Sequence, residues 1–133
     1  MIILDENIHD IDVRTAIERW YPGQVLSVTK LRPQSTIKDE ALPTLLRQAQ
    51  QPTFVTINVN DFWRTTLASP DYCIVTLELI QERVMDIPDY LRGLLRRNEF
   101  KTKAAPMGKV IHWTPARIEY YEFNRRIIRI DAE

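Results

Sequence analysis

Apolar and polar positions alternate along the chain in two distinct patterns. Short continuous apolar runs are typical of strands buried on both faces, and apolar residues recurring every three or four positions are typical of amphipathic helices. Strands are expected at residues 2–4, 24–31, 53–57, 73–79, 109–113, 117–123 and 127–130. Helices are expected at residues 11–20, 39–50 and 86–95. This β-α-β-α-β-β-α-β-β order predicts an α/β fold with a mainly parallel sheet and a C-terminal antiparallel hairpin.

The ends of the helices follow from individual residues. Asp10 or Asp12 is available to cap the first helix, and Pro22-Gly23 ends it. Pro43 is tolerated only in a first helical turn, so the second helix has to begin just before it. Asp39 and Glu40 are therefore expected at the start of that helix.

Length and composition indicate one domain without a membrane span. The chain has 133 residues, of which 44% are hydrophobic and 27% charged, as in ordinary globular proteins. No apolar run approaches the roughly 20 residues needed to cross a bilayer. The first residues become acidic too soon for a signal peptide, and the single cysteine, Cys73, suits a reducing compartment. We expect a cytoplasmic protein.

The zero net charge conceals an asymmetry between the two parts of the chain. Residues 1–80 carry seven Lys/Arg and ten Asp/Glu, whereas residues 81–133 carry eleven and eight. The positive charge gathers near the third predicted helix, at Arg92, Arg96, Arg97, Lys101 and Lys103. These residues suit either a solvated helix end or a local patch that binds nucleic acid.

Acidic residues occur where the predicted sheet would place them together. Asp5 follows the first strand, Asp61 follows the third, and Asp39 opens the helix that leads into the third. Ligands of open parallel sheets bind beyond the carboxyl ends of the strands. Carboxylates gathered there would repel one another without a cation, and hard oxygen ligands favour Mg²⁺ or Mn²⁺.

Two motifs resemble the PIN and PIN-like domains of VapC-type toxins. One is Leu4-Asp5-Glu6-Asn7 after the first strand, and the other is the T-x-N-x-x-D-F stretch from Thr56 to Phe62. The resemblance covers about residues 1–80, while the basic helix and hairpin of residues 81–133 are similar to a compact bacterial PIN-like subfamily. It implies a three-layer α/β/α fold in a single domain.

The resemblance also implies a function and roles for individual residues. It implies a Mg²⁺- or Mn²⁺-dependent endoribonuclease in which Asp5, Asp39 and Asp61 hold the metal. Thr56 and Asn58 would orient these carboxylates. It further implies RNA as substrate, an antitoxin protein as partner and a homodimer. The chain departs from the family because residues 31–38 are too few for the helical arm that carries a further Glu; Glu6 and Glu40 are the available substitutes.

Other interpretations of the same residues remain open. Asp39 follows Thr36 at capping-box spacing, and Asp61 with its neighbouring asparagines could form a turn. A PIN-like module that binds RNA or protein without catalysis fits a depleted acidic site. A phosphoacceptor receiver domain also has acids after its first and third strands, but Lys109 begins a strand where that class needs a lysine at a strand end.

Four further residues are interpreted as structural. His9 and His112 lack the spacing of a metal site, and Cys73 lies inside an apolar strand. Trp63 favours core packing over stacking on a base.

Overall fold

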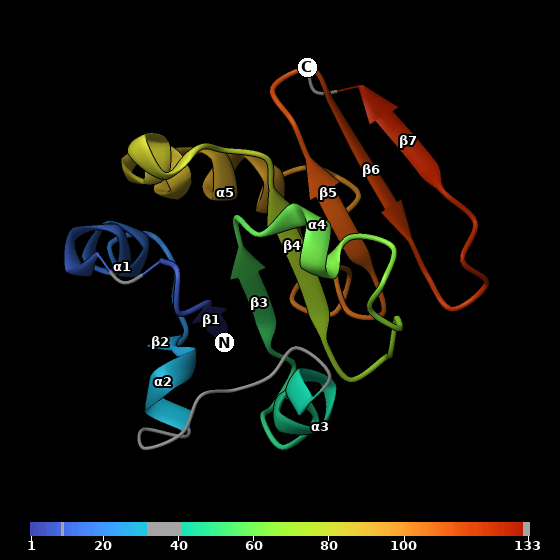
Figure 1. Ribbon diagram of the computed structural model, residues 1–133, viewed down its shortest axis with the longest axis horizontal. Helices are drawn as coiled ribbons and strands as arrows, with labels where there is room; N and C mark the ends of the chain where they lie inside the picture. The colour runs from blue at the N-terminus through green and yellow to red at the C-terminus, as the bar shows by residue number, and fades with distance from the viewer. Residues whose placement is uncertain (9, 32–40, 132–133) are drawn as a thin grey trace.

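One sheet of seven strands organises the described part of the chain, residues 1–8, 10–31 and 41–131 of a computed structural model (Figure 1). Its strand order is β2-β1-β3-β4-β5-β6-β7. The strands are β1 (Ile2–Leu4), β2 (Val25–Ser27), β3 (Thr53–Thr56), β4 (Cys73–Leu77), β5 (Val110–Trp113), β6 (Arg117–Tyr121) and β7 (Ile128–Asp131). The helices are α1 (Ile11–Glu18), α2 (Val28–Leu31), α3 (Leu42–Arg47), α4 (Val59–Phe62), the 3₁₀ helix η2 (Gln81–Asp86) and α5 (Ile87–Leu95).

The sheet combines a parallel core with an antiparallel edge. Strands β2, β1, β3, β4 and β5 are parallel, and β5, β6 and β7 are antiparallel. Parallel neighbours need crossover helices, and α1, α3 and α5 lie in such crossovers. The predicted α/β class, with a mainly parallel sheet and a C-terminal hairpin, is confirmed.

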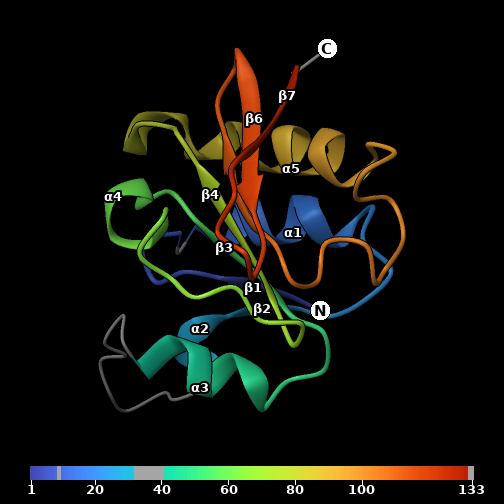
Figure 2. The same ribbon diagram turned by 90° about the vertical axis from the view of Figure 1, so that its right-hand side faces the viewer.

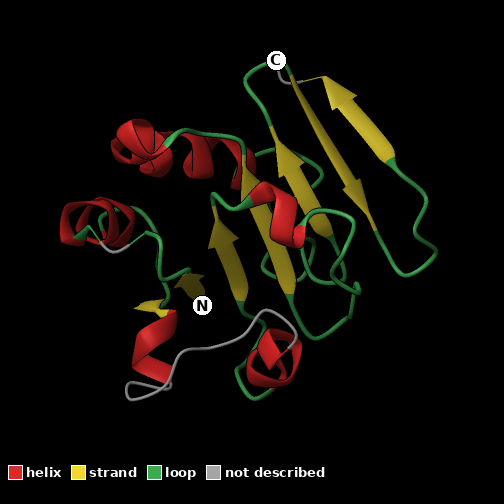
Figure 3. Ribbon diagram, viewed as in Figure 1, coloured by secondary structure: helices red, strands yellow, loops and turns green. Residues whose placement is uncertain are grey.

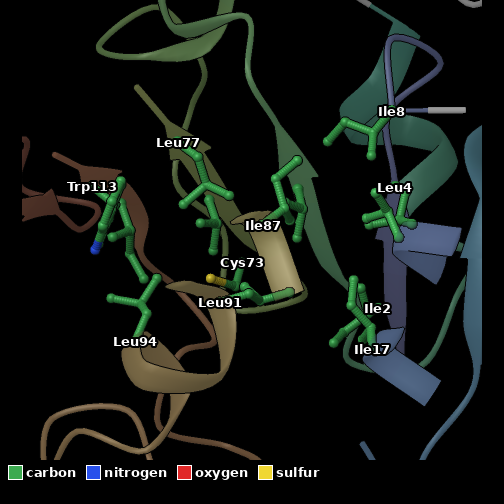
Figure 4. Close-up of a cluster of buried hydrophobic side chains, with 14 of the residues drawn as sticks. Ile2, Leu4, Ile8, Ile17, Cys73, Leu77, Ile87, Leu91, Leu94 and Trp113 are labelled. Atoms are coloured by element: carbon green, nitrogen blue, oxygen red, sulfur yellow. The ribbon is translucent and has the colours of Figure 1, made fainter. Parts of the chain in front are cut away.

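Helices cover both faces of the sheet and give three layers (Figure 2). On one face, α1 and α5 bury Ile17, Ile87 and Leu91 against strand residues that include Ile2 and Leu77 (Figure 4). On the other face, α2, α3 and α4 pack on a second cluster. Its buried members are Ile3, Val28, Leu42, Leu45, Leu46, Phe54, Phe62, Tyr72, Ile74, Val110 and Tyr121. The strands therefore have apolar residues on both faces, which is why they read as continuous apolar runs.

Most helix ends lie where local chemistry predicts. Asp10 is the N-cap of α1, and its side chain accepts a hydrogen bond from the Asp12 backbone N–H at 2.8 Å. Pro43 and Pro88 occupy the first turns of α3 and α5, where their missing N–H groups cost nothing. After α5, residues 96–109 run as loop and turns to β5 (Figure 3).

Three features differ from the sequence prediction. The strand expected at residues 24–31 ends at Ser27, because β1, its neighbour among the described strands, offers three residues for pairing. Val28 then begins α2 and is buried in the second cluster. Helix α4 and η2 were not predicted, since elements of four to six residues are too short to show a periodic pattern.

No helix in the described ranges is long and apolar enough to cross a membrane.

Candidate functional site

Asp5 lies directly after β1, where the winding of the sheet changes direction. Strand β1 has β2 on one side and β3 on the other, and all three are parallel. Their carboxyl ends therefore meet at one edge of the sheet, which we call the carboxyl edge. Ligands of open α/β sheets bind in the crevice outside such a switch point. The structure thus places Asp5 at the position where this fold class binds its ligands.

A chain of hydrogen bonds joins Asp5 to the second motif. Thr56 Oγ1 donates to Asp5 Oδ2 at 2.6 Å and accepts the Asn58 backbone N–H at 2.9 Å. Asn58 Nδ2 donates to Asp61 Oδ2 at 2.5 Å. Two stretches that are separated in sequence therefore form one cluster. We call Asp5, Thr56, Asn58 and Asp61 the Asp5 site.

The Asp5 site runs from the protein interior to the surface. Thr56 is fully buried and Asp5 is 9% exposed, whereas Asp61 is exposed to solvent. Asp5 Oδ1 also accepts the backbone N–H of Glu6 at 2.8 Å. Thr56 and this N–H fix the orientation of the Asp5 carboxylate, so it is held in place before any ligand arrives.

Helix α4 explains how the T-x-N-x-x-D-F stretch presents its polar groups. Phe62 is buried and its ring lies 5.4 Å from that of Phe54 in β3, which anchors the helix on the sheet. Successive helical residues point about 100° apart, so Asp61 turns outward as Phe62 turns inward. Thr65 Oγ1 donates to the Asp61 backbone carbonyl at 2.6 Å and closes the next turn. The apolar anchor and the carboxylate are therefore set by one short helix.

The Asp5 site offers carboxylate oxygens, the ligand type that a hard divalent cation prefers. Mg²⁺ is typically held by one or two carboxylates and completes its shell with waters and phosphate oxygens. Asp5 and Asp61 supply two carboxylates. In residues 1–8, 10–31 and 41–131, no group of three or more His, Cys, Asp or Glu side chains is close enough to hold a metal ion.

Of the other acidic residues predicted for this site, Glu6 alone belongs to the described residues. Asp39 and Glu40 lie outside the described residues, as does His9. Glu6 is exposed, and its backbone N–H is the group that contacts Asp5.

Sequence reasoning missed a row of buried polar residues that extends from the Asp5 site across the sheet. Leu4 of β1 pairs with Val55 of β3, so Asp5 lies level with Thr56. From there the strand pairing continues across the sheet: Thr56 pairs with Thr76 of β4, and Thr76 pairs with His112 of β5. His112 in turn pairs with Glu119 of β6. All face the layer of α3 and α4, and each is at most 9% exposed. We call these residues the polar row: Asp5, Thr56, Thr76, His112 and Glu119. The available signal was a polar residue within, or directly after, a mainly apolar strand in β1, β3, β4 and β5.

His112 lies between two carboxylates in this row. Its Nε2 is 3.1 Å from Glu78 Oε1, and its Nδ1 is 3.9 Å from Glu119 Oε1. The Trp63 ring packs 5.0 Å from the imidazole, so Trp63 is a packing residue as expected. Glu119 also contacts Arg117 and Arg129, each at 3.3 Å. His112 is therefore enclosed by Glu78, Glu119 and the Trp63 ring.

Cys73 is buried in the opposite cluster, as expected of an inert core residue. Burial raises the pKa of its thiol to about 12, which keeps it protonated at neutral pH.

The basic residues predicted to bind nucleic acid do not lie at the carboxyl edge. Arg92, Arg96, Lys101 and Lys103 line a pocket together with Met1 and Thr53, the residues at the start of β1 and β3. Arg97 is separate from this set, because its Nε binds Glu99 Oε1 at 3.2 Å. The predicted patch therefore faces the opposite edge of the sheet from Asp5.

Comparison of the chain with family models, curated proteins and solved structures found no match.

Proposed function

We propose that this protein is a metal-dependent endoribonuclease of the PIN-like type, hydrolysing RNA phosphodiester bonds with Mg²⁺ or Mn²⁺. The observation that carries the proposal is the hydrogen-bonded chain from Asp5 through Thr56 and Asn58 to Asp61. Its place at the switch point of the sheet adds support, because this is where the fold class binds ligands.

Each residue of the Asp5 site has a defined part in this proposal. Asp5 is the buried metal ligand and is held by Thr56, whereas Asp61 is the solvent-exposed metal ligand and is held by Asn58. The resemblance to PIN-like domains adds Asp39 as a third ligand. When bound, the ion supplies positive charge that polarises a phosphoryl group and lowers the pKa of a bound water. The protein contributes fixed carboxylates, of which Asp61 lies at the surface where an RNA strand can reach it.

Metal-dependent cleavage of single-stranded RNA tests the proposal. The purified protein is incubated with a fluorescent RNA oligonucleotide in Mn²⁺, in Mg²⁺ or in excess chelator. Asp5→Asn removes the inner ligand, while Asp12→Asn, a change at an exposed carboxylate of α1, is the matched control. We expect cleavage by the wild type and the control in either metal, and loss of a hundredfold or more in Asp5→Asn.

The same experiment separates the leading proposal from its alternative. Equal cleavage by wild type and Asp5→Asn, or cleavage that survives the chelator, would refute the assignment of a carboxylate-bound metal. RNA binding without cleavage by every variant would favour a non-catalytic PIN-like module, which the small number of carboxylates in the described site supports.

Two further interpretations have less support. A receiver-like phosphoacceptor needs a lysine at the carboxyl edge, but Lys109 directly precedes β5 and its Nζ donates to the Ala105 carbonyl at 2.5 Å. The role of toxin in a toxin–antitoxin pair, with an antitoxin partner and a homodimer, depends on the resemblance alone. Co-expression with candidate partner proteins and measurement of the mass in solution test it.

A further inference from the structure

A pocket of about 410 Å³ opens at the edge of the sheet where the parallel strands begin. Residues of the α1–β2 turn line one side, and α5 with the loop after it lines the other (Figure 2). Thr53 contributes to the pocket, whereas Thr56, at the other end of β3, belongs to the Asp5 site. A strand rises about 3.3 Å per residue, so roughly 10 Å of β3 separates the two. The pocket and the Asp5 site are therefore different sites.

The charge lining the pocket is entirely positive. Arg92, Arg96, Lys101 and Lys103 all line it, and no Asp or Glu of the described residues does. In the same part of the chain, none of these four cations has a carboxylate within 4.0 Å. Arg92 and Arg96 are four residues apart, at the end of α5, and so lie on the same face of the helix. Four like charges around one concavity create a positive potential that attracts an anion.

The other wall of the pocket is aromatic. The rings of Trp20 and Tyr21 meet edge to face with centroids 6.1 Å apart. The backbone nitrogen of Met1 donates to Tyr21 Oη at 2.6 Å, which fixes that ring. Phe100 lies on the side of α5 and the loop after it; it is 1% exposed and packs against Tyr120 at 5.7 Å. The rings of Trp20 and Tyr21 are partly exposed, so they offer a surface for stacking by a planar group.

We propose that this basic pocket binds a nucleoside phosphate, with the phosphate among the four cations and the base against Trp20 and Tyr21. The nucleoside phosphate is either a free nucleotide or the terminal nucleotide of an RNA strand. Small-molecule pockets typically hold about 300–1,000 Å³, so a pocket of about 410 Å³ suits one nucleotide better than a longer stretch. The proposal is independent of the nuclease proposal, because the lining residues do not include those of the Asp5 site.

Calorimetric titration of the full chain tests the pocket with four probes: AMP, adenosine, inorganic phosphate and an RNA tetramer with or without a 5′-phosphate. The test variant is Arg96→Gln combined with Lys103→Gln. The control, Arg83→Gln with Arg126→Gln, removes the same charge from residues outside the pocket. All four side chains are exposed residues, so the fold is expected to persist, and circular dichroism checks it.

We expect AMP to bind at least tenfold more tightly than phosphate or adenosine, because its phosphate contacts the cations and its base contacts Trp20 and Tyr21. The test variant should lose about tenfold or more in affinity, because it removes two of the four cations that line the pocket, and the control should not change. A phosphorylated tetramer that binds more tightly than AMP indicates an RNA end as the source, and the reverse order indicates a free nucleotide.

Three results would overturn the proposal. These are no binding of AMP or tetramer at millimolar concentration, equal binding by the test variant and the control, or phosphate binding as tightly as AMP. Asp5→Asn serves as the reference for the other site. Asp5→Asn should abolish RNA cleavage and leave AMP binding intact. Cleavage and AMP binding are measured separately, so either proposal can fail while the other holds.

Discussion

Replacing Thr56 with valine tests whether the hydrogen-bonded chain holds the Asp5 site together. Valine keeps nearly the shape of threonine but has no hydroxyl group. Thr56 is fully buried, and its Oγ1 both donates to Asp5 and accepts the Asn58 backbone N–H. The substitution therefore removes one donor from a carboxylate and leaves one backbone N–H without its acceptor.

The expected cost follows from these two contacts. A hydrogen bond to a charged group contributes about 1.5–3 kcal/mol, and a buried donor left without a partner costs about 1–3 kcal/mol. We therefore expect Thr56→Val to lower the free energy of unfolding by about 3 kcal/mol or more. Thr56→Ser keeps the hydroxyl group and removes one buried methyl group, at a cost of about 1 kcal/mol. The difference between the two variants isolates the hydrogen bonds.

Urea unfolding, followed by the fluorescence of the three tryptophans, measures both variants against the wild type. Thr56→Val should lose about 2 kcal/mol more than Thr56→Ser, with an unchanged slope against urea concentration. A loss below about 1 kcal/mol in Thr56→Val, or equal losses in the two variants, would show that the chain of contacts does not stabilise the fold.

Two further predictions concern stability. Burial raises the pKa of the Cys73 thiol from 9.0 to about 12, so above pH 9 the unfolded chain loses a proton that the folded chain keeps. Unfolding should therefore become easier by about 1.4 kcal/mol per pH unit between pH 9 and 12. Cys73→Ala should show a smaller decline when both are unfolded in urea across this range, and parallel curves would contradict this. Gly93 lies in α5, and beyond its chain neighbours and its own helix backbone no atom of the described residues comes within 4 Å of the place that a Cβ would take. Gly93→Ala should therefore raise the free energy of unfolding by about 0.5–1 kcal/mol. Gly108 has φ +88°, so Gly108→Ala should lower it by about 1–2 kcal/mol, and thermal melts that move the same way for both would refute the argument.

The central strands were predictable because their environment leaves a local signal. Strands β1, β3 and β4 are buried on both faces, so each appears as a short run of mainly apolar residues. Strand β2 was predicted too long, because its length is set by its three-residue neighbour and not by its own composition. Local patterns predict where a strand lies, but its partner decides how far it extends.

The candidate site was predictable where it is local in sequence. Thr56, Asn58 and Asp61 lie within six residues, and their hydrogen bonds form within one turn and one short helix. The meeting of this stretch with Asp5 follows from the parallel pairing of β1 with β3. The contact of His112 with Glu119 was not predictable, because it depends on the register of the antiparallel hairpin.

The basic residues near the end of α5 also show that a sequence can predict a cluster of charges but not their contacts. Their clustering between residues 92 and 103 is visible in the sequence, but the direction each side chain takes is not. Arg97 turns to Glu99, while Arg96, its neighbour, lines the pocket beside Trp20. Arg96 is the C-cap of α5 and Arg97 follows outside the helix, so these neighbouring cations have different partners although they are adjacent in sequence.

The polar row also constrains which strand alignments the chain can adopt. Successive side chains in a strand point to opposite faces, so a slip of one residue in β5 would replace His112 in the row with Ile111 or Trp113. The imidazole would then meet the apolar layer of α1 and α5, while Glu119 would face a hydrocarbon side chain. A misaligned sheet therefore costs free energy in two ways: a polar group is buried without a partner, and an apolar contact is lost. The row thereby selects a single alignment of the strands as the sheet assembles.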